Sequence, residues 1–379
     1  MTKGIIIMKR MLGISSVIVI GILIVISGCD KKEAAMIKIG AILPLTGEAA
    51  KYGQSAKNAI DLAVEEINNT GGINGKKVKI AFEDDQADPK IGVAVLQKLI
   101  SVDRVTVAIG AMASSVTLAI APIADKKHII LMSPASTAAA VTNAGDYIFR
   151  VCASDMLEGK AMVDFLAQDK KFKRFGMIYI QNEYGVGLKD VFVNRLKELG
   201  EALILSEAFQ PNETDFRSQI QKLKNANLDG IYVVGYKEQA IFFRQAKEYG
   251  LRVPFFATTM VEDPDLLEKA GASAMEGIVY TYRSYDPESS KDYVQQFVNK
   301  FKMKYNAIPD FYAGVGYDAA RVVFDVISKV GVNANDVKNA LYQVKEFPGV
   351  TGSITFDENG DVIQPMRMKV IRNGKFQNL

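Results

Sequence analysis

The 379-residue chain has little of what metal centres and covalent catalysis require, since it contains one histidine and two cysteines. It has no Cys/His cluster with metal-ligand spacing, no Gly-x-Ser-x-Gly segment and no Walker-type phosphate loop. His128 stands alone between an expected helix and an expected strand, and Cys152 has no histidine near it to activate the thiol. We therefore expect no enzyme, no metal ion and no cofactor.

The N-terminus has the pattern of an export signal. Lys9 and Arg10 precede an apolar run over residues 11–26, which is short for a membrane span. The segment Ile26-Ser27-Gly28-Cys29 follows, and it resembles a bacterial lipobox, which implies cleavage before Cys29 and lipidation of its thiol. Residues 1–28 are therefore expected to be a lipoprotein signal peptide. The rest would lie in the periplasm or at the cell surface, anchored through Cys29.

The remaining chain has no excess of charge. Lys3, Lys9 and Arg10 lie in the removed segment and account for the formal charge of +3. Without a basic stripe, a nucleic-acid partner is not expected. With Cys29 lipidated, only Cys152 remains, so an intrachain disulfide is excluded.

Strand and helix patterns alternate along the chain without a low-complexity linker. An apolar run at residues 36–43 precedes a helical pattern, and the alternation restarts near residues 150–155. Later, three helices are predicted at 291–305, 312–330 and 336–344, and then a hairpin around residues 356–361. This order predicts an α/β fold with parallel sheets covered on both faces, in domains that exchange chain more than once.

Two hydroxyl-rich loops are the first candidate for a site. Residues 105–109 and 129–132 read as strands, and the loops after them, at residues 113–115 and 133–137, are each expected to open a helix. Because helix starts and the carboxyl ends of parallel strands favour anions, the two loops could clamp a carboxylate. Alternatively, Ser114, Ser115 and Thr137 only cap their helices.

The order of short motifs resembles the solute-binding proteins of ABC importers for branched-chain amino acids and related amides. The resemblance covers nearly all of the chain after the signal peptide. Its motifs are Gly40-Ala41-Ile42-Leu43-Pro44-Leu45-Thr46-Gly47, Ala63-Val64-Glu65-Glu66-Ile67-Asn68, Gly71-Gly72-Ile73, Asp84-Asp85 with Asp88-Pro89, Ser114-Ser115, Ser133-Pro134-Ala135-Ser136-Thr137, Tyr184-Gly185 and Gly316-Tyr317-Asp318-Ala319.

The resemblance implies a type I periplasmic binding protein fold, with two Rossmann-like lobes joined by a three-crossover hinge. The expected N-terminal lobe comprises residues 36–153 and 284–355, and the C-terminal lobe comprises residues 154–283 and 356–379. The ligand would be trapped between the lobes when the hinge closes.

The resemblance also implies a ligand site. Ser114 and Thr137 would bind the ligand carboxylate, and the carbonyl of Ala135 would accept from its ammonium group. Tyr52 and Tyr184 would line the cleft, with Tyr236 at the ammonium end. The alternative for each tyrosine is a partly buried loop anchor.

One departure from the pattern concerns the ammonium group. Thr259 stands where amino-acid binders place an acidic residue, and a buried cation without a counter-charge is costly. Either another acid reaches the site, or the ligand has no free ammonium. The candidate acids are Glu183, Glu238, Glu262 and Asp263.

These observations favour a substrate-binding lipoprotein of an ABC importer that captures a small carboxylate-bearing solute. A branched-chain or other apolar amino acid is the expected ligand, and the permease and ATPase subunits are the expected partners. The alternatives are a ligand that is not an amino acid, such as an amide or an aliphatic or aromatic carboxylate, and a ligand sensor that reports to a signalling partner.

Overall fold

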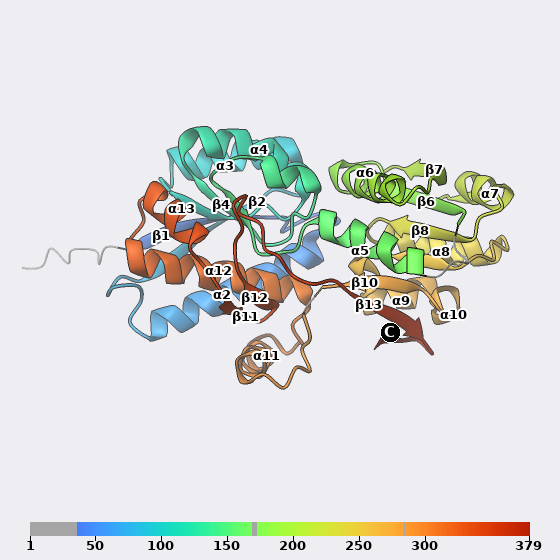
Figure 1. Cartoon of the computed structure of the whole chain (residues 1–379). Coiled ribbons are helices and arrows are strands. Elements are labelled where there is room, and N and C mark those ends of the chain that lie inside the picture. The colour runs from blue at the N-terminus through green and yellow to red at the C-terminus, as the bar shows by residue number, and fades with distance from the viewer. Residues whose placement is uncertain (1–35, 169–172, 284) are drawn as a thin grey trace, which may run out of the picture. The chain divides into compact units, whose positions relative to one another are not determined.

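The computed structural model describes residues 36–168, 173–283 and 285–379, so the expected signal peptide and Cys29 lie outside the described residues. Within these ranges, no helix combines the length and the apolar character that a membrane crossing needs. Two large sheets with helices around them make up most of the described chain (Figure 1).

The first sheet is entirely parallel. Its strand order is β2 (Val78–Asp84), β1 (Ile37–Leu43), β3 (Val107–Ile109), β4 (Ile130–Ser133) and β5 (Ile148–Arg150). Successive side chains enter opposite cores: Ile39 and Ala41 pack into one cluster and Ile42 into the other. Burial on both faces is typical of a parallel sheet, which explains why these strands are continuous apolar runs.

Helices from distant parts of the sequence cover the first sheet. Figure 1 shows α3 (Pro89–Ser101) and α4 (Ser114–Lys127) on one side of it, with α2 (Ala50–Asn69) and α12 (Phe311–Val330) on the other. Helices α11 (Asp292–Tyr305) and α13 (Ala334–Tyr342) contribute to the same core as α12. The small hairpin of β11 (Phe347–Gly349) and β12 (Gly352–Ile354) follows α13.

The second sheet is mixed. Its order is β14 (Lys375–Asn378), β13 (Arg367–Arg372), β10 (Val279–Tyr282), β9 (Phe255–Ala257), β8 (Gly230–Val234), β6 (Phe175–Ile180) and β7 (Leu203–Phe209). The strands from β7 to β10 pair in parallel, and β13 and β14 add an antiparallel edge.

The helices of the second half belong to this sheet. They are α5 (Asp155–Gln168), α6 (Glu183–Glu198), α7 (Arg217–Asn225), α8 (Glu238–Glu248), α9 (Pro264–Ala270) and α10 (Ala272–Met275). A separate hydrophobic core lies among these elements. The α/β fold class expected from the alternation is thus confirmed.

In the described ranges the chain passes between the two sheets after β5, after β10 and after β12. The last passage holds the turn expected around Asn359-Gly360, closed by a single bridge between Phe356 and Val362. The strands predicted beside that turn are wrong, because the terminal hairpin is β13 and β14, which turns at Asn373-Gly374. Helices α9 and α10 were not predicted, since their short apolar faces repeat too few times to show a period.

Two glycines let a helix start close to a strand exit. A Cβ at Gly53 in α2 would collide with the carbonyl of Pro44, and one at Gly185 in α6 would collide with that of Ile180. The helix starts are therefore held against the ends of β1 and β6. This places Tyr52 and Tyr184, which precede the glycines, in helical first turns. Tyr184 is the second residue of α6.

Candidate functional site

Buried hydroxyl groups fasten the two loops that follow β3 and β4. The carbonyl oxygen of Ala111 accepts hydrogen bonds from Ser133 Oγ at 2.7 Å, Ser136 Oγ at 3.0 Å and Thr117 Oγ1 at 3.2 Å. Ser136 Oγ and Thr117 Oγ1 also lie 2.7 Å apart. These hydroxyls hold the loops together, which leaves Ser114 and Thr137 as the candidate ligand groups.

Capping does not explain Ser114 or Thr137. The N-cap of α4 is Ala113, and Ser114 Oγ instead accepts from the backbone N–H of Ala138 in the other loop at 3.2 Å. Thr137 precedes the N-cap Ala138 of a five-residue 3-10 helix (Ala139–Asn143). The capping alternative is therefore wrong for both residues. The expected α-helix after the second loop is also wrong, because only this short 3-10 helix forms.

Arg150, at the end of β5, fixes the orientation of the second loop. This fully buried side chain donates through Nη1 to the carbonyls of Ser136, Thr137 and Ala138 at 3.2, 3.0 and 2.9 Å. In a trans peptide the C=O and the following N–H point in opposite directions. Arg150 thus directs the N–H groups of the loop away from itself.

Arg150 also connects the loop to the third passage between the sheets. Its Nε and Nη2 donate to the two carboxylate oxygens of Asp361, each at 2.6 Å. Such bidentate pairs have a fixed geometry. The sequence did not predict this pair, because the two residues are 211 positions apart and neither stands in a recognisable motif.

The four aromatic rings near the predicted site form two pairs. Tyr184 stacks on Tyr236 with ring centroids 5.3 Å apart, and Tyr52 contacts Tyr312 at 4.5 Å. Burial raises the pKa of Tyr52 to about 12. The hydroxyl of Tyr184 donates to Thr258 at 3.2 Å, which connects the first pair to the residue before Thr259.

The acids named from the sequence have other roles. Glu183 is exposed, Glu262 pairs with Lys369 at 2.6 Å, and Asp263 caps α9 and pairs with Lys51 at 3.0 Å. Glu238 is buried, and its Oε1 accepts from the N–H of Asn212 at 2.8 Å. None of these contacts places a carboxylate against Thr259.

A different acid contacts Thr259. Glu158, one turn into α5, accepts a hydrogen bond from the backbone N–H of Thr259 at 3.3 Å and one from the hydroxyl of Thr281. Its other oxygen pairs with Arg283, which also lies 3.3 Å from Asp155. The spacing of Asp155 and Glu158 by three residues, on one face of a helix, was a signal in the sequence. Their partners are more than 100 positions away, so the sequence did not indicate a cluster.

Asp155 connects this charged cluster to the second loop. Its backbone N–H donates to the carbonyl of Thr137 at 2.7 Å. Burial, followed by the charge of Glu158, raises the pKa of the Asp155 carboxyl to about 7, whereas Arg283 and the Thr137 side chain act in the opposite direction. Burial likewise raises the pKa of the neighbouring Cys152 thiol to about 11, so this free cysteine is a poor nucleophile.

The residues predicted from the sequence thus fall into connected groups. Ser114 and Thr137 belong to the fastened loops, and Thr259 and Tyr184 adjoin the charged cluster through Glu158 and Thr258. Tyr236 is connected to this group because its ring stacks on that of Tyr184. Ala135 lies half-buried in the second loop. Across the described ranges, no group of histidine, cysteine and acidic side chains is arranged to hold a metal ion.

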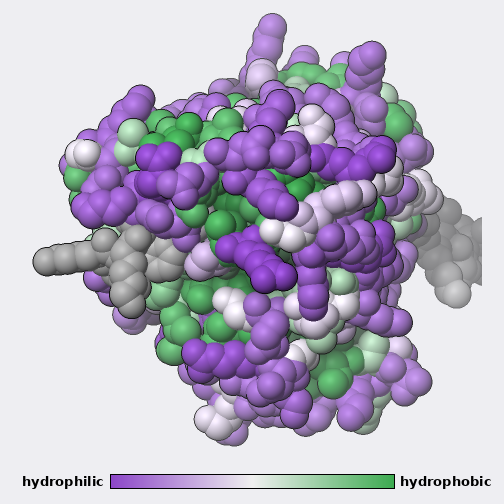
Figure 2. All heavy atoms as spheres, turned by 90° about the vertical axis from the view of Figure 1, so that its right-hand side faces the viewer, coloured by the Kyte–Doolittle hydropathy of each residue, from purple (hydrophilic) through white to green (hydrophobic). Residues whose placement is uncertain are grey.

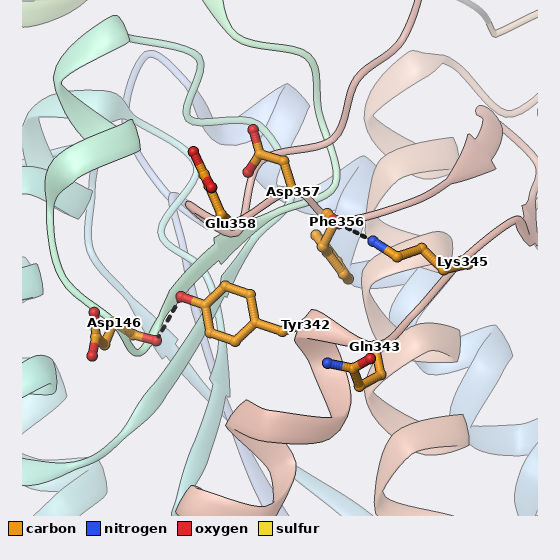
Figure 3. A pocket seen from close by; sticks show the side chains of 7 residues that line it. All are labelled: Asp146, Tyr342, Gln343, Lys345, Phe356, Asp357 and Glu358. Atoms are coloured by element: carbon orange, nitrogen blue, oxygen red, sulfur yellow. Dashed lines mark hydrogen bonds between the residues drawn. The ribbon is translucent and has the colours of Figure 1, made fainter.

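A surface hollow lies elsewhere. Figure 3 shows it between α13 and the third passage, where Tyr342 donates to the carbonyl of Asp146 at 3.2 Å and Lys345 to that of Phe356 at 2.8 Å. Its lining contains none of the residues predicted to bind ligand. In Figure 2, the visible face of the molecule is mostly hydrophilic, with hydrophobic residues in small patches.

Known proteins match the chain over nearly the whole described length. A sequence model described as periplasmic binding protein matches residues 36–375. A leucine-, isoleucine-, valine-, threonine- and alanine-binding protein of Pseudomonas aeruginosa is 30% identical over 87% of this chain and 88% of its own length.

Solved structures of two binding proteins also superpose on this chain. A leucine-binding protein from Thermotoga maritima superposes with a TM-score of 0.83 at 30% identity, covering 91% of this chain and 98% of that one. A branched-chain amino acid transporter substrate-binding protein from Streptococcus pneumoniae, solved with isoleucine, superposes with a TM-score of 0.81 at 26% identity, covering 90% and 98%.

Proposed function

The chain belongs to the periplasmic binding protein family, and on that premise we propose that it captures a free apolar α-amino acid for an ABC importer. Leucine, isoleucine and valine are the first ligands to test, because they occur in the name of the Pseudomonas aeruginosa relative. The role is binding and delivery rather than catalysis, which agrees with the raised pKa of the only cysteine in the described residues.

One observation carries the proposal: the backbone N–H of Asp155 donates to the carbonyl of Thr137, and the Thr137 side chain also interacts with the Asp155 carboxyl. An α-amino acid carries its carboxylate and its ammonium on the same carbon, so its site must present donors and an anion side by side. Ser114 with the N–H groups of the second loop supplies the donors, and Asp155 supplies the anion. Glu238 lacks this contact with the loop, so Asp155 is the better partner for the ammonium group.

Hinge closure is the proposed mechanism of capture. The lobes would be residues 36–153 with 284–355, and residues 154–283 with 356–379. Because Ser114 and Thr137 belong to the first lobe and Asp155 to the second, a zwitterionic ligand held by both would stabilise the closed form. Contacts such as Lys51 with Asp263 and Tyr312 with Met260 join the same two parts.

Export, lipidation at Cys29 and membrane attachment through that lipid complete the proposal. The permease and ATPase subunits of an importer are the proposed partners. Mass spectrometry of the membrane fraction would detect a diacylglyceryl group on Cys29, and a Cys29→Ala variant would be released from the membrane if that lipid is the anchor.

Calorimetric titration of the purified protein with leucine, isoleucine, valine and threonine tests the ligand class. We expect saturable binding of at least one apolar amino acid. The combined substitution Ser114→Ala and Thr137→Ala should abolish it while leaving the melting temperature of the ligand-free protein nearly unchanged. Unaltered binding in that variant would contradict the site, and tight binding of an amide or a simple carboxylate instead would contradict the ligand class.

A further inference from the structure

The charged cluster consists of Asp155, Glu158 and Arg283. It contains two acids, whereas one acid is enough to pair with an ammonium group. Asp155 and Glu158 project from α5, and Arg283 follows β10. All three side chains are buried. Buried carboxylates are costly unless they are paired, so three charges at one point call for a separate explanation.

The two carboxylates are satisfied unequally. Glu158 uses both oxygens: Oε1 accepts from Thr281 and Thr259, and Oε2 pairs with Arg283. Asp155 uses only Oδ1, which lies 3.3 Å from Arg283. Within the described part of the chain, Asp155 Oδ2 and Arg283 Nε are buried and have no hydrogen-bond partner.

Partnerless buried polar atoms are uncommon in folded proteins. Here two of them occur on neighbouring residues of opposite charge, and the hydroxyl of Tyr232 nearby is a third. This concentration indicates a place that a polar ligand group completes. Arg283 is shared between Glu158 and Asp155, and the three side chains together carry one net negative charge.

We propose that Glu158 and Arg283 set the charge selectivity of the ligand site. Arg283 offsets only one of the two carboxylates, so the cluster keeps one net negative charge and requires one cationic group from the ligand. This inference rests on the proposed function and names the property that separates amino acids from simple carboxylates. It also accounts for Thr259, since the acid missing at that position is supplied by α5.

The proposal makes a charge-counting prediction. Removing the charge of Glu158 leaves Arg283 with Asp155 as its nearest acid, so the cluster becomes neutral and no longer requires an ammonium group. Removing the charge of Arg283 as well restores one net negative charge. A purely structural ion pair would affect stability in both variants without this reversal of ligand preference.

The test compares L-leucine with 4-methylpentanoate, which has the same carbon skeleton and carboxylate without the ammonium group. Titration calorimetry is run on the wild-type protein, Glu158→Gln, and the double variant Glu158→Gln with Arg283→Met. The wild-type protein should prefer leucine by about 100-fold, as expected when a buried charge loses its partner. Glu158→Gln should reduce this ratio at least tenfold, and the double variant should restore it.

Glu238→Gln is the matched control, because Glu238 is a buried acid of the same half whose Oε2 also has no partner among the described residues. It should keep the wild-type ratio. Melting temperatures check folding, and Glu158→Gln preserves the shape of the side chain.

Three results overturn the proposal. An unchanged ratio in Glu158→Gln would show that the pair is structural only, with the proposed function intact. The same holds if the double variant keeps the ratio of Glu158→Gln. If the wild-type protein binds neither compound nor any other amino acid, the proposed function fails and the charge selectivity fails with it.

Discussion

The two halves of the candidate site are built from different chemistry. On the side of the first sheet, hydroxyls and backbone groups of the loops after β3 and β4 are arranged around the carbonyl of Ala111. On the side of the second sheet, Asp155, Glu158 and Arg283 form a buried charged cluster. The first half can bind an anion with neutral groups, whereas the second half needs a counter-charge. We therefore expect the second half to decide which charge the ligand must carry.

The difference also concerns how each half is held. The loop that carries Thr137 is fixed by Arg150, whose guanidinium is satisfied on every side. The charged cluster has partnerless atoms on Asp155 and Arg283 among the described residues. The first half is thus preorganised, and we expect a ligand to complete the second.

The largest expected effect comes from removing the counter-charge. Asp155→Asn should weaken leucine binding by at least about 100-fold, because it leaves a buried ammonium unpaired at a cost of about 3–5 kcal/mol. Glu238→Gln should change binding less than twofold. Titration calorimetry of both variants decides the matter, and an equal loss in the two would remove the distinction between Asp155 and Glu238.

The second prediction separates positioning from stability in the first half. Arg150→Lys loses the donation to three carbonyls and should weaken leucine binding about tenfold, or about 1.4 kcal/mol. Asp361→Asn keeps those donations, so it should lower the free energy of unfolding with little change in affinity. Urea unfolding and calorimetry on both variants provide the two readouts. Equal affinity losses would mean that Arg150 acts only through stability.

The third prediction concerns pH. Because the pKa of Asp155 is raised to about 7, its carboxyl is protonated below that value, and an ammonium ligand favours the ionised form. Leucine affinity should rise up to about tenfold per pH unit towards pH 7 and level off above it. A flat profile in the wild-type protein would contradict the role of Asp155, and Asp155→Asn should abolish the slope.

The ligand-free protein should show the opposite trend. A carboxyl whose folded pKa is raised contributes stability below its unfolded pKa of about 3.9, and that contribution is lost as pH rises through about 7. The groups facing Asp155 are Glu158 on α5, Arg283 after β10, Arg150 on β5, Cys152 before α5, and Tyr184, Tyr232 and Tyr236. Melting curves from about pH 5 to 8 should fall for the wild-type protein and flatten for Asp155→Asn.

The smallest effect is expected at Thr259. Because Asp155 is the proposed counter-charge, Thr259→Glu should not improve leucine binding, and the new carboxylate would lie next to Glu158, which accepts from the N–H of Thr259. A few-fold loss is the expected outcome by calorimetry. A clear gain would mean that the counter-charge is missing in the natural sequence and that the physiological ligand lacks an ammonium group.

The sequence indicated the first half of the site better than the second. Ser114 and Thr137 lie in consecutive loops of one strand–helix series, so local patterns were sufficient to bring them together. The sequence could not rule out that these residues only cap helices. The structure does so for Ser114, because its hydroxyl accepts from the N–H of Ala138 in the other loop. The α/β class followed from the same alternation of strands and helices.

The charged cluster could not be predicted from the sequence. Its members come from distant segments, since Asp155 and Glu158 follow the passage after β5 and Arg283 follows β10. Glu158 and Arg283 are 125 positions apart, and each alone is an ordinary charged residue in the sequence. The four acids chosen near Thr259 were neighbours in sequence or motif, yet Glu262 and Asp263 already have lysine partners. Long-range pairing, rather than local spacing, decides which acid reaches the site.

A crystal structure of the protein with bound leucine tests the central claim most directly. The carboxylate should contact Ser114 and Thr137, and the ammonium should lie within hydrogen-bonding distance, about 2.7–3.2 Å, of Asp155 Oδ2. A complex in which Ser114 and Thr137 face away from the ligand, or in which Asp155 Oδ2 stays without contact to it, would contradict the account.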